Sequence, residues 1–144
     1  MRNLPSELEA LVKVIATYIE HRVDHFTLQT HGGAYIDGPY VQALQEHDNI
    51  LLIEASSNEF LNPKLDESSQ QKMLFLGWRF FPEKYLPNYA QFIDQSKSSP
   101  REIAEIMVKT LHFAYGVEET YGFEIGPKLD AAGDLMSELG IVNG

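Results

Sequence analysis

The sequence predicts an α+β domain in which helices pack on an antiparallel β-sheet, a meander of three strands plus one or two more. Two observations support this: helical and strand periodicities come in separate blocks, and the three clearest strands follow one another through short polar connections. A parallel sheet is disfavoured because each parallel pair needs a long crossover. Since the 144 residues contain neither repeats nor low-complexity segments, we expect a single domain over 1–144.

The first element is predicted to be a helix over residues 6 to about 20. Ser6 and Glu9 have the spacing of a capping box, in which two side chains satisfy the free amides of a helix start. Apolar residues then recur at helical spacing from Leu8 to Ile19. We therefore expect an amphipathic helix with one buried face.

Three strands are predicted next. Residues 26–31 alternate with a period of two before a turn at Gly32 and Gly33. Two more strand-like runs, 40–45 and 49–55, are joined by the polar turn 46–48. Short connections of this kind favour an antiparallel meander.

The second half of the sequence predicts further helices and short strands. Asp66 can cap a second helix that ends at Gly77, and extended pieces are expected at 79–81 and 89–93. Ser99 to Glu102 is the clearest helix start, with proline preset for the first helical position, and this helix should end at Gly116. A shorter final helix, weakened by Gly133, is expected within 127–140.

Charge and composition restrict the classes of partner. The formal net charge of -10 disfavours nucleic acid and anionic membranes, and the absence of cysteine excludes disulfides and thiolate chemistry. The N-terminal residues lack the apolar run of a signal peptide, and no apolar stretch approaches the roughly 20 residues of a membrane span. We expect a cytoplasmic protein.

Motifs of common enzyme classes are missing from the sequence. It contains neither a glycine-rich nucleotide loop, nor a zinc-protease HExxH, nor a GxSxG nucleophile motif, so we expect no catalytic residue and no cofactor. His21, His25 and His31 could form a metal site if His47 or Glu54 joined them. Their spacing across two elements favours surface histidines instead.

Three polar residues have two interpretations each. Glu54 lies in an apolar strand and could be a buried general base, but alternation with Leu51 and Ile53 favours a position facing water, together with Leu52. Asn58 and Asn88 could bind the backbone of a partner, although turn formation is the favoured role.

Aromatic residues gather between the second helix and the long third helix. They either fill the core or line a groove for a peptide or an apolar ligand, and some could do both. The run consists of Trp78, Phe80, Phe81, Tyr85, Tyr89 and Phe92.

Several short sequence motifs together resemble a known family. They are 40–42, 54–58 with 60–61, Leu76 to Trp78 with Pro82, 87–89, and the helix that ends near Thr110 and Leu111. Through these motifs, the segment from residue 40 to about residue 117 resembles the YbjN-like domains related to type III secretion chaperones, often called TY-Chap domains. The resemblance implies a secretion-chaperone-like fold of helix, three antiparallel strands, helix, further strands and long helix. It also implies a small, acidic, cytoplasmic protein, commonly dimeric, that holds an extended segment of a partner.

Three functional hypotheses follow. The first is a non-catalytic module that binds a protein or an extended peptide, with a contact surface formed by Trp78, Phe80, Phe81 and Tyr89. The second is a small-molecule sensor or enzyme with a pocket between sheet and helices, anchored by Glu54 and a histidine. The third is a regulatory subunit that acts only by forming a homodimer or by docking on one larger protein.

Overall fold

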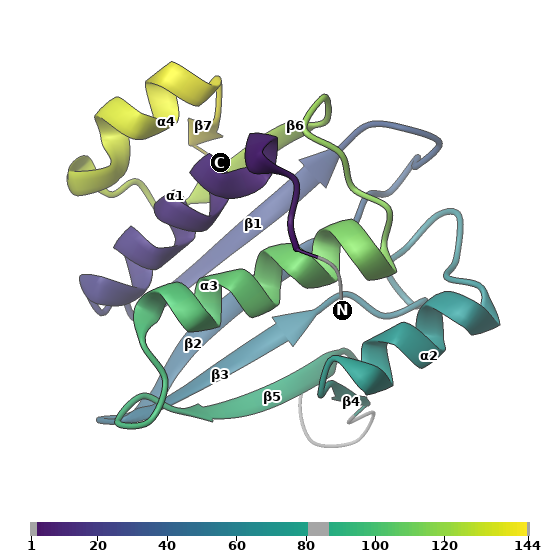
Figure 1. Ribbon diagram of the computed structural model, residues 1–144, viewed down its shortest axis with the longest axis horizontal. Helices are drawn as coiled ribbons and strands as arrows, with labels where there is room; N and C mark the ends of the chain where they lie inside the picture. Colours follow the sequence, from purple (N-terminus) through teal and green to yellow (C-terminus); the bar gives the residue numbers. More distant parts are fainter. Residues whose placement is uncertain (1–2, 81–86, 144) are drawn as a thin grey trace.

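A computed structural model describes residues 3–80 and 87–143, and in them four α-helices accompany one sheet of seven strands (Figure 1). The helices are α1 (Glu9–Glu20), α2 (Glu67–Phe75), α3 (Pro100–Lys109) and α4 (Gly133–Leu139). The strands are β1 (His25–His31), β2 (Tyr40–His47), β3 (Ile50–Ala55), β4 (Arg79–Phe80), β5 (Tyr89–Asp94), β6 (Gly122–Gly126) and β7 (Val142–Asn143). The α+β class and the order of the central elements agree with the prediction from sequence.

The sheet has the strand order β4-β5-β3-β2-β1-β6-β7. The predicted meander β1-β2-β3 lies at its centre, and every pair is antiparallel except β6 with β7. After β5 the chain crosses the sheet as α3 and returns as β6 beside β1 (Figure 1). The strand β6 was not predicted.

One face of the sheet is covered by α1 and α3, which pack side by side (Figure 1). Alternate residues of β1 to β3 point into this layer, among them Phe26, Leu28, Val41 and Ile53, all fully buried. Each such side chain contributes about 1.5–3 kcal/mol when it leaves water. The main core therefore lies between the meander and these two helices.

The two predicted helix starts behave differently. At α3 the Ser99 hydroxyl accepts a hydrogen bond from the Glu102 amide, and the Glu102 carboxylate accepts one from the Ser99 amide, which confirms the capping box. The prediction of a capping box at Ser6 is wrong. The chain enters α1 through a 3-10 turn (Ser6–Leu8) that follows Pro5, and no side chain caps it.

The helix α3 continues into a π-helical turn, η2 (Thr110–Ala114), before Gly116 ends it with a φ of 75°. The Thr110 hydroxyl donates back to the Ile106 carbonyl at 2.7 Å and accepts from the Trp78 indole at 2.8 Å. A side-chain hydroxyl that bonds within the helix perturbs the regular ladder. Trp78 is thereby fixed against the end of α3.

The segment after Gly116 extends the sheet and then returns to α1. Within it the predicted final helix is confirmed as α4, which ends at Gly140 in the left-handed conformation. The Tyr18 hydroxyl of α1 donates to the Pro127 carbonyl at 2.7 Å, which joins this segment to the helical layer. None of the helices formed by residues 3–80 and 87–143 has the length and apolar character needed to cross a bilayer.

Candidate functional site

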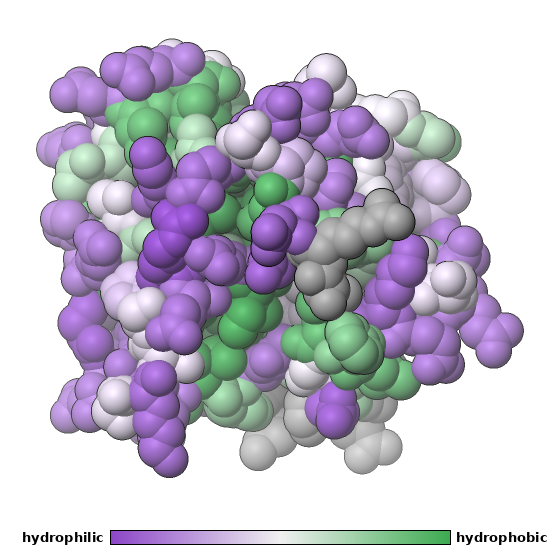
Figure 2. All heavy atoms as spheres, viewed as in Figure 1, coloured by the Kyte–Doolittle hydropathy of each residue, from purple (hydrophilic) through white to green (hydrophobic). Residues whose placement is uncertain are grey.

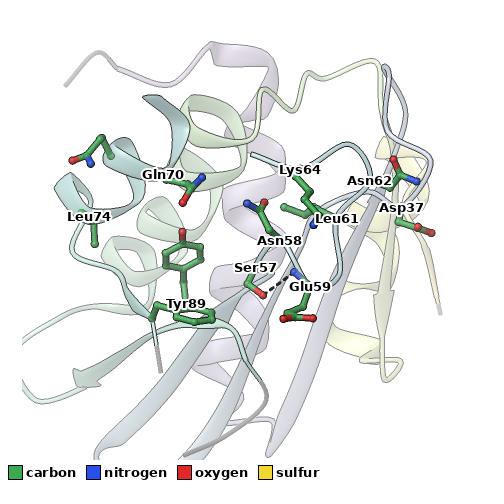
Figure 3. A pocket seen from close by; sticks show the side chains of 12 residues that line it. Asp37, Ser57, Asn58, Glu59, Leu61, Asn62, Lys64, Gln70, Leu74 and Tyr89 are labelled. Atoms are coloured by element: carbon green, nitrogen blue, oxygen red, sulfur yellow. Dashed lines mark hydrogen bonds between the residues drawn. The ribbon is translucent and has the colours of Figure 1, made fainter. Parts of the chain in front are cut away.

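A hollow of about 760 Å³ lies between α2, the loop that follows β3, the end of β4 and the start of β5 (Figure 3). Its lining combines amide side chains, a few charges and a small apolar wall. The lining residues are Asp37, Ser57, Asn58, Glu59, Leu61, Asn62, Lys64, Gln70, Gln71, Leu74, Phe80 and Tyr89. We call this hollow the α2 groove.

Hydrogen bonds of Asn58 hold the loop that forms one wall of the α2 groove. Its side chain accepts from the Leu65 amide at 2.7 Å and donates to the Leu65 carbonyl at 3.4 Å. Asp66 then caps α2 by accepting from the Ser69 amide, which lowers the pKa of the Asp66 carboxyl. The predicted turn-forming role of Asn58 is confirmed, although its side chain also lines the groove.

A second loop supplies the end of the groove at Asp37. The Ile36 amide donates to the Asn62 carbonyl at 2.7 Å, and the Asn62 amide donates to the Asp37 carbonyl at 3.1 Å. Gly38 follows directly, and a side chain there would collide with the Thr30 carbonyl of β1. This close approach fixes Asp37 beside Asn62 (Figure 3).

Buried polar contacts anchor the floor of the groove. Asn88 accepts from the Ser57 amide at 3.3 Å and donates to the Tyr40 hydroxyl at 2.9 Å. The Ser57 hydroxyl donates to the Pro87 carbonyl. Asn88 is 1% exposed, so it supports the loop and does not face a partner in this structure.

The apolar wall of the groove comes from α2, β4 and β5. The rings of Phe80 and Tyr89 meet edge to face with centroids 5.7 Å apart, and burial raises the pKa of the Tyr89 hydroxyl. Phe80 and Leu74 are each 45% exposed, and the neighbouring Phe75 is 74% exposed. The surface view shows apolar area at the end of α2 that leads to β4 (Figure 2).

The predicted aromatic run is divided by the structure. Trp78 is fully buried in the core, while Phe80 and Tyr89 line the groove. Phe92 is 44% exposed on the opposite face of the sheet, because it pairs with Leu52 on the side away from α1 and α3. Phe81 and Tyr85 lie outside the described residues.

The prediction that Glu54 and Leu52 face water is wrong. They do share a face of β3, as alternation required, but Glu54 is only 7% exposed and Leu52 is fully buried. The strand lies between β2 and β5, whose side chains cover it from both sides. The Glu54 Oε1 accepts from Gln42 at 3.0 Å, and its buried Oε2 has no hydrogen-bond partner among residues 3–80 and 87–143.

The histidines considered as metal ligands are dispersed. His21 contacts the Thr17 carbonyl on α1, whereas His31 pairs with Glu124 of β6 at 2.6 Å. His25 and His47 lie at strand ends. In the part of the chain that the structure describes, no group of three or more histidine, aspartate or glutamate side chains could hold a metal ion.

Much of the α2 groove was not predicted from the sequence. Leu74 falls within the predicted second helix, where Leu74 and Phe75 follow the buried Met73 directly, so that all three cannot share one buried face. That run of apolar residues was the available signal. For Asp37, Asn62, Lys64, Gln70 and Gln71 no sequence pattern indicates a shared site, because they come from separate segments.

The family comparison covers most of the chain. A family model described as TY-Chap3, "T3SS (YopN, CesT) and YbjN peptide-binding chaperone 3", matches residues 5–122. This span includes every residue of the α2 groove. No curated protein matches the chain, and no solved structure does.

Proposed function

The chain belongs to the TY-Chap3 family of T3SS and YbjN peptide-binding chaperones, and on this premise we propose that it binds extended segments of other proteins and catalyses no reaction on them. The observation that carries the proposal is the α2 groove, an open hollow in which exposed apolar side chains lie beside amides. A segment that lacks regular structure presents both kinds of group.

The polar lining of the groove suits an extended backbone. Such a backbone exposes amide donors and carbonyl acceptors that secondary structure would otherwise pair. The side-chain amides of Asn62 and Gln71 have both functions, and neither makes a side-chain hydrogen bond with the described residues. They are available to pair with the backbone of a partner.

The apolar wall would bind side chains of the same partner. We propose Phe80 and Tyr89 as direct contacts, joined by Leu74, because aromatic and apolar groups in a partly covered hollow supply most of the energy of peptide contacts. Trp78 would not contact the partner but would position the apolar wall, since its indole bond to Thr110 fixes the start of β4. Phe81 was predicted for the same surface and lies outside the described residues.

The test compares two leucines in matched positions. Leu74 lies near the end of α2 at 45% exposure, and Leu139 ends α4 at 39% exposure. Peptides that bind the full chain are selected on an array of unstructured sequences, and their Kd is measured by fluorescence anisotropy. Leu74→Ser and Phe80→Ser should weaken binding about tenfold or more, whereas Leu139→Ser should leave it unchanged.

Two results would contradict the proposal. One is the absence of any bound peptide on the array at micromolar protein concentration. The other is equal weakening by Leu74→Ser and Leu139→Ser, which would place the contact outside the groove. Thermal unfolding of each variant serves as the control for folding.

Two finer parts of the proposal concern the state of the protein in the cell. We propose that it forms a homodimer and acts in the cytoplasm, as the sequence resemblance implies. Large apolar side chains remain exposed outside the α2 groove, including Phe75 and Val142, and a second copy could cover part of this area. Light scattering coupled to gel filtration would give the mass, and cell fractionation the compartment.

A further inference from the structure

A second hollow, of about 560 Å³, adjoins the α2 groove. It lies over the end of β1, the start of β2 and the loop after β3. Its lining includes His31, Ile36, Tyr40 and Phe60. Asp37, Glu59 and Leu61 line both hollows. The two hollows are therefore neighbours that share these three residues, which we call the waist, and we call the two hollows together the track.

The waist carries two carboxylates without partners in the chain. Asp37 and Glu59 are exposed, and neither side chain makes a hydrogen bond or ion pair with residues 3–80 or 87–143. Some other acids are engaged, since Glu9 pairs with Arg101 and Asp94 accepts from Ser96. Exposed acids such as Glu118 are also unpaired within the described residues, but Glu118 lines neither hollow. The waist is thus a place where negative charge remains available.

Positive charge is sparse along the rest of the track. Lys64 lines the α2 groove but not the second hollow. His31 lines the second hollow and already pairs with Glu124 at 2.6 Å. The waist therefore contributes two negative charges without a cation that lines both hollows, in a chain whose net charge is -10.

Apolar side chains flank the waist on both sides. In the α2 groove these are Leu74 and Phe80, and in the second hollow they are Ile36 and Phe60, which are 79% and 38% exposed. The Phe60 ring lies 6.2 Å from that of Tyr40, which forms part of the same wall. An isoleucine as exposed as Ile36 gains from being covered.

We propose that the track selects an extended peptide in which a lysine or arginine lies over Asp37 and Glu59, between apolar residues that occupy the two hollows. This inference rests on the proposed function and adds the chemistry of the partner to it. The cation finds two carboxylates at the waist, and the acidic protein attracts basic segments at longer range. Lys64 disfavours a second cation in the α2 groove, so the basic residue belongs at the waist.

The experiment uses the full chain and nine-residue fluorescent peptides. Their sequences are randomised apolar and polar mixtures except for a fixed central lysine, serine or glutamate. At low salt, lysine-centred peptides should bind about tenfold more tightly than glutamate-centred ones, and the ratio should shrink as salt rises. The double variant Asp37→Asn/Glu59→Gln should reduce the ratio to about twofold.

The matched control removes the same charge elsewhere. Glu118→Gln/Glu138→Gln also neutralises two exposed carboxylates, and neither residue lines the track. It should retain the lysine preference. Lys64→Gln tests the opposite sign and should tighten lysine-centred binding about twofold. Ile36→Ser should weaken all three peptide sets if the second hollow is occupied.

The possible failures are distinguishable. If the wild-type chain binds all three sets equally, or if the control variant loses the preference as fully as the waist variant, the inference is wrong and the proposed function stands. An unchanged affinity in Ile36→Ser would overturn the part that concerns the second hollow. If no set binds, the proposed function fails, and the inference fails with it.

Discussion

The helices α3 and α2 have nearly equal lengths, of 10 and 9 residues, but opposite relations to the core. Ile103, Ala104, Met107 and Val108 of α3 are all fully buried against the sheet. In α2 only Met73 is buried, and Leu74 and Phe75 face outward. The helix α3 buries its apolar residues in the core, whereas α2 leaves most of its own apolar residues exposed.

This difference shows where binding can occur without loss of the fold. A face that is already packed cannot bind a partner unless the core opens, which costs most of the stability of a domain. The helix α2 is held by local contacts: the Asp66 cap at its start, and the buried Met73 and the Trp78 indole bond at and after its end. Its exposed side chains can therefore change contacts while the sheet and α3 stay in place.

The largest expected effect is the difference in stability loss between truncating a buried side chain of α3 and an exposed one of α2. Met107→Ala on α3 should lower the free energy of unfolding by about 2–5 kcal/mol, because it leaves a cavity beneath a fully buried side chain. Leu74→Ala on α2 should change it by less than about 1 kcal/mol. Urea denaturation of both variants measures the difference, and similar losses would show that the end of α2 belongs to the core.

The next effect tests the link between the two helices. Trp78→Phe keeps most of the apolar volume but removes the indole donor to Thr110, and should cost about 1–3 kcal/mol. A double-mutant cycle with Thr110→Val isolates this bond. Additive losses would mean that the hydrogen bond contributes nothing to holding β4 and the groove wall against α3.

A smaller effect compares the two caps. Ser99→Ala removes half of the capping box of α3 and should cost about 0.5–2 kcal/mol of global stability, because α3 forms part of the main core. Asp66→Ala should affect hydrogen exchange in α2 more than the global midpoint, since α2 can open locally. Exchange measured amide by amide distinguishes them, and global unfolding by Asp66→Ala would contradict the comparison.

The sequence predicted α3 more completely than it predicted α2. For α3, the cap, the proline at the first turn and the apolar stripe all describe one buried helix, and local rules were sufficient. For α2, the cap at Asp66 and the end at Gly77 were correct. The exposure of Leu74 was not foreseen, because it depends on which side of the helix meets the sheet.

The errors elsewhere have the same physical origin. Alternation placed Glu54 and Leu52 on one face of β3, but their burial depends on the neighbours β2 and β5, which local pattern does not specify. The strand β6 is five residues long with glycine at both ends, and its pairing with β1 spans about ninety residues of sequence. The α2 groove likewise assembles side chains from separate loops, so only its aromatic members Phe80 and Tyr89 were predicted as contacts, while for Asn58 a binding role was considered and turn formation favoured.

The smallest effect concerns pH and the two caps. Bonds from the Ser99 backbone amide and hydroxyl lower the pKa of Glu102 below its ordinary 4.5, and the Ser69 amide lowers that of Asp66 below 3.8. A carboxyl whose pKa is lower in the folded state stabilises the fold above its unfolded pKa. That contribution disappears as the pH falls through the folded value, so both helix starts should loosen only in acid, below about pH 4.

NMR titration of the side-chain carboxyl signals tests this prediction and distinguishes the two helices. Ser99→Ala removes the hydroxyl but keeps the backbone amide, so it should return the pKa of Glu102 only part of the way toward its ordinary value, and it should leave the pKa of Asp66 unchanged. Wild-type midpoints at or above the ordinary values would show that the caps do not persist in solution. A shift of Asp66 in Ser99→Ala would instead mean that α2 and α3 respond as one unit, contrary to the independence that the groove requires.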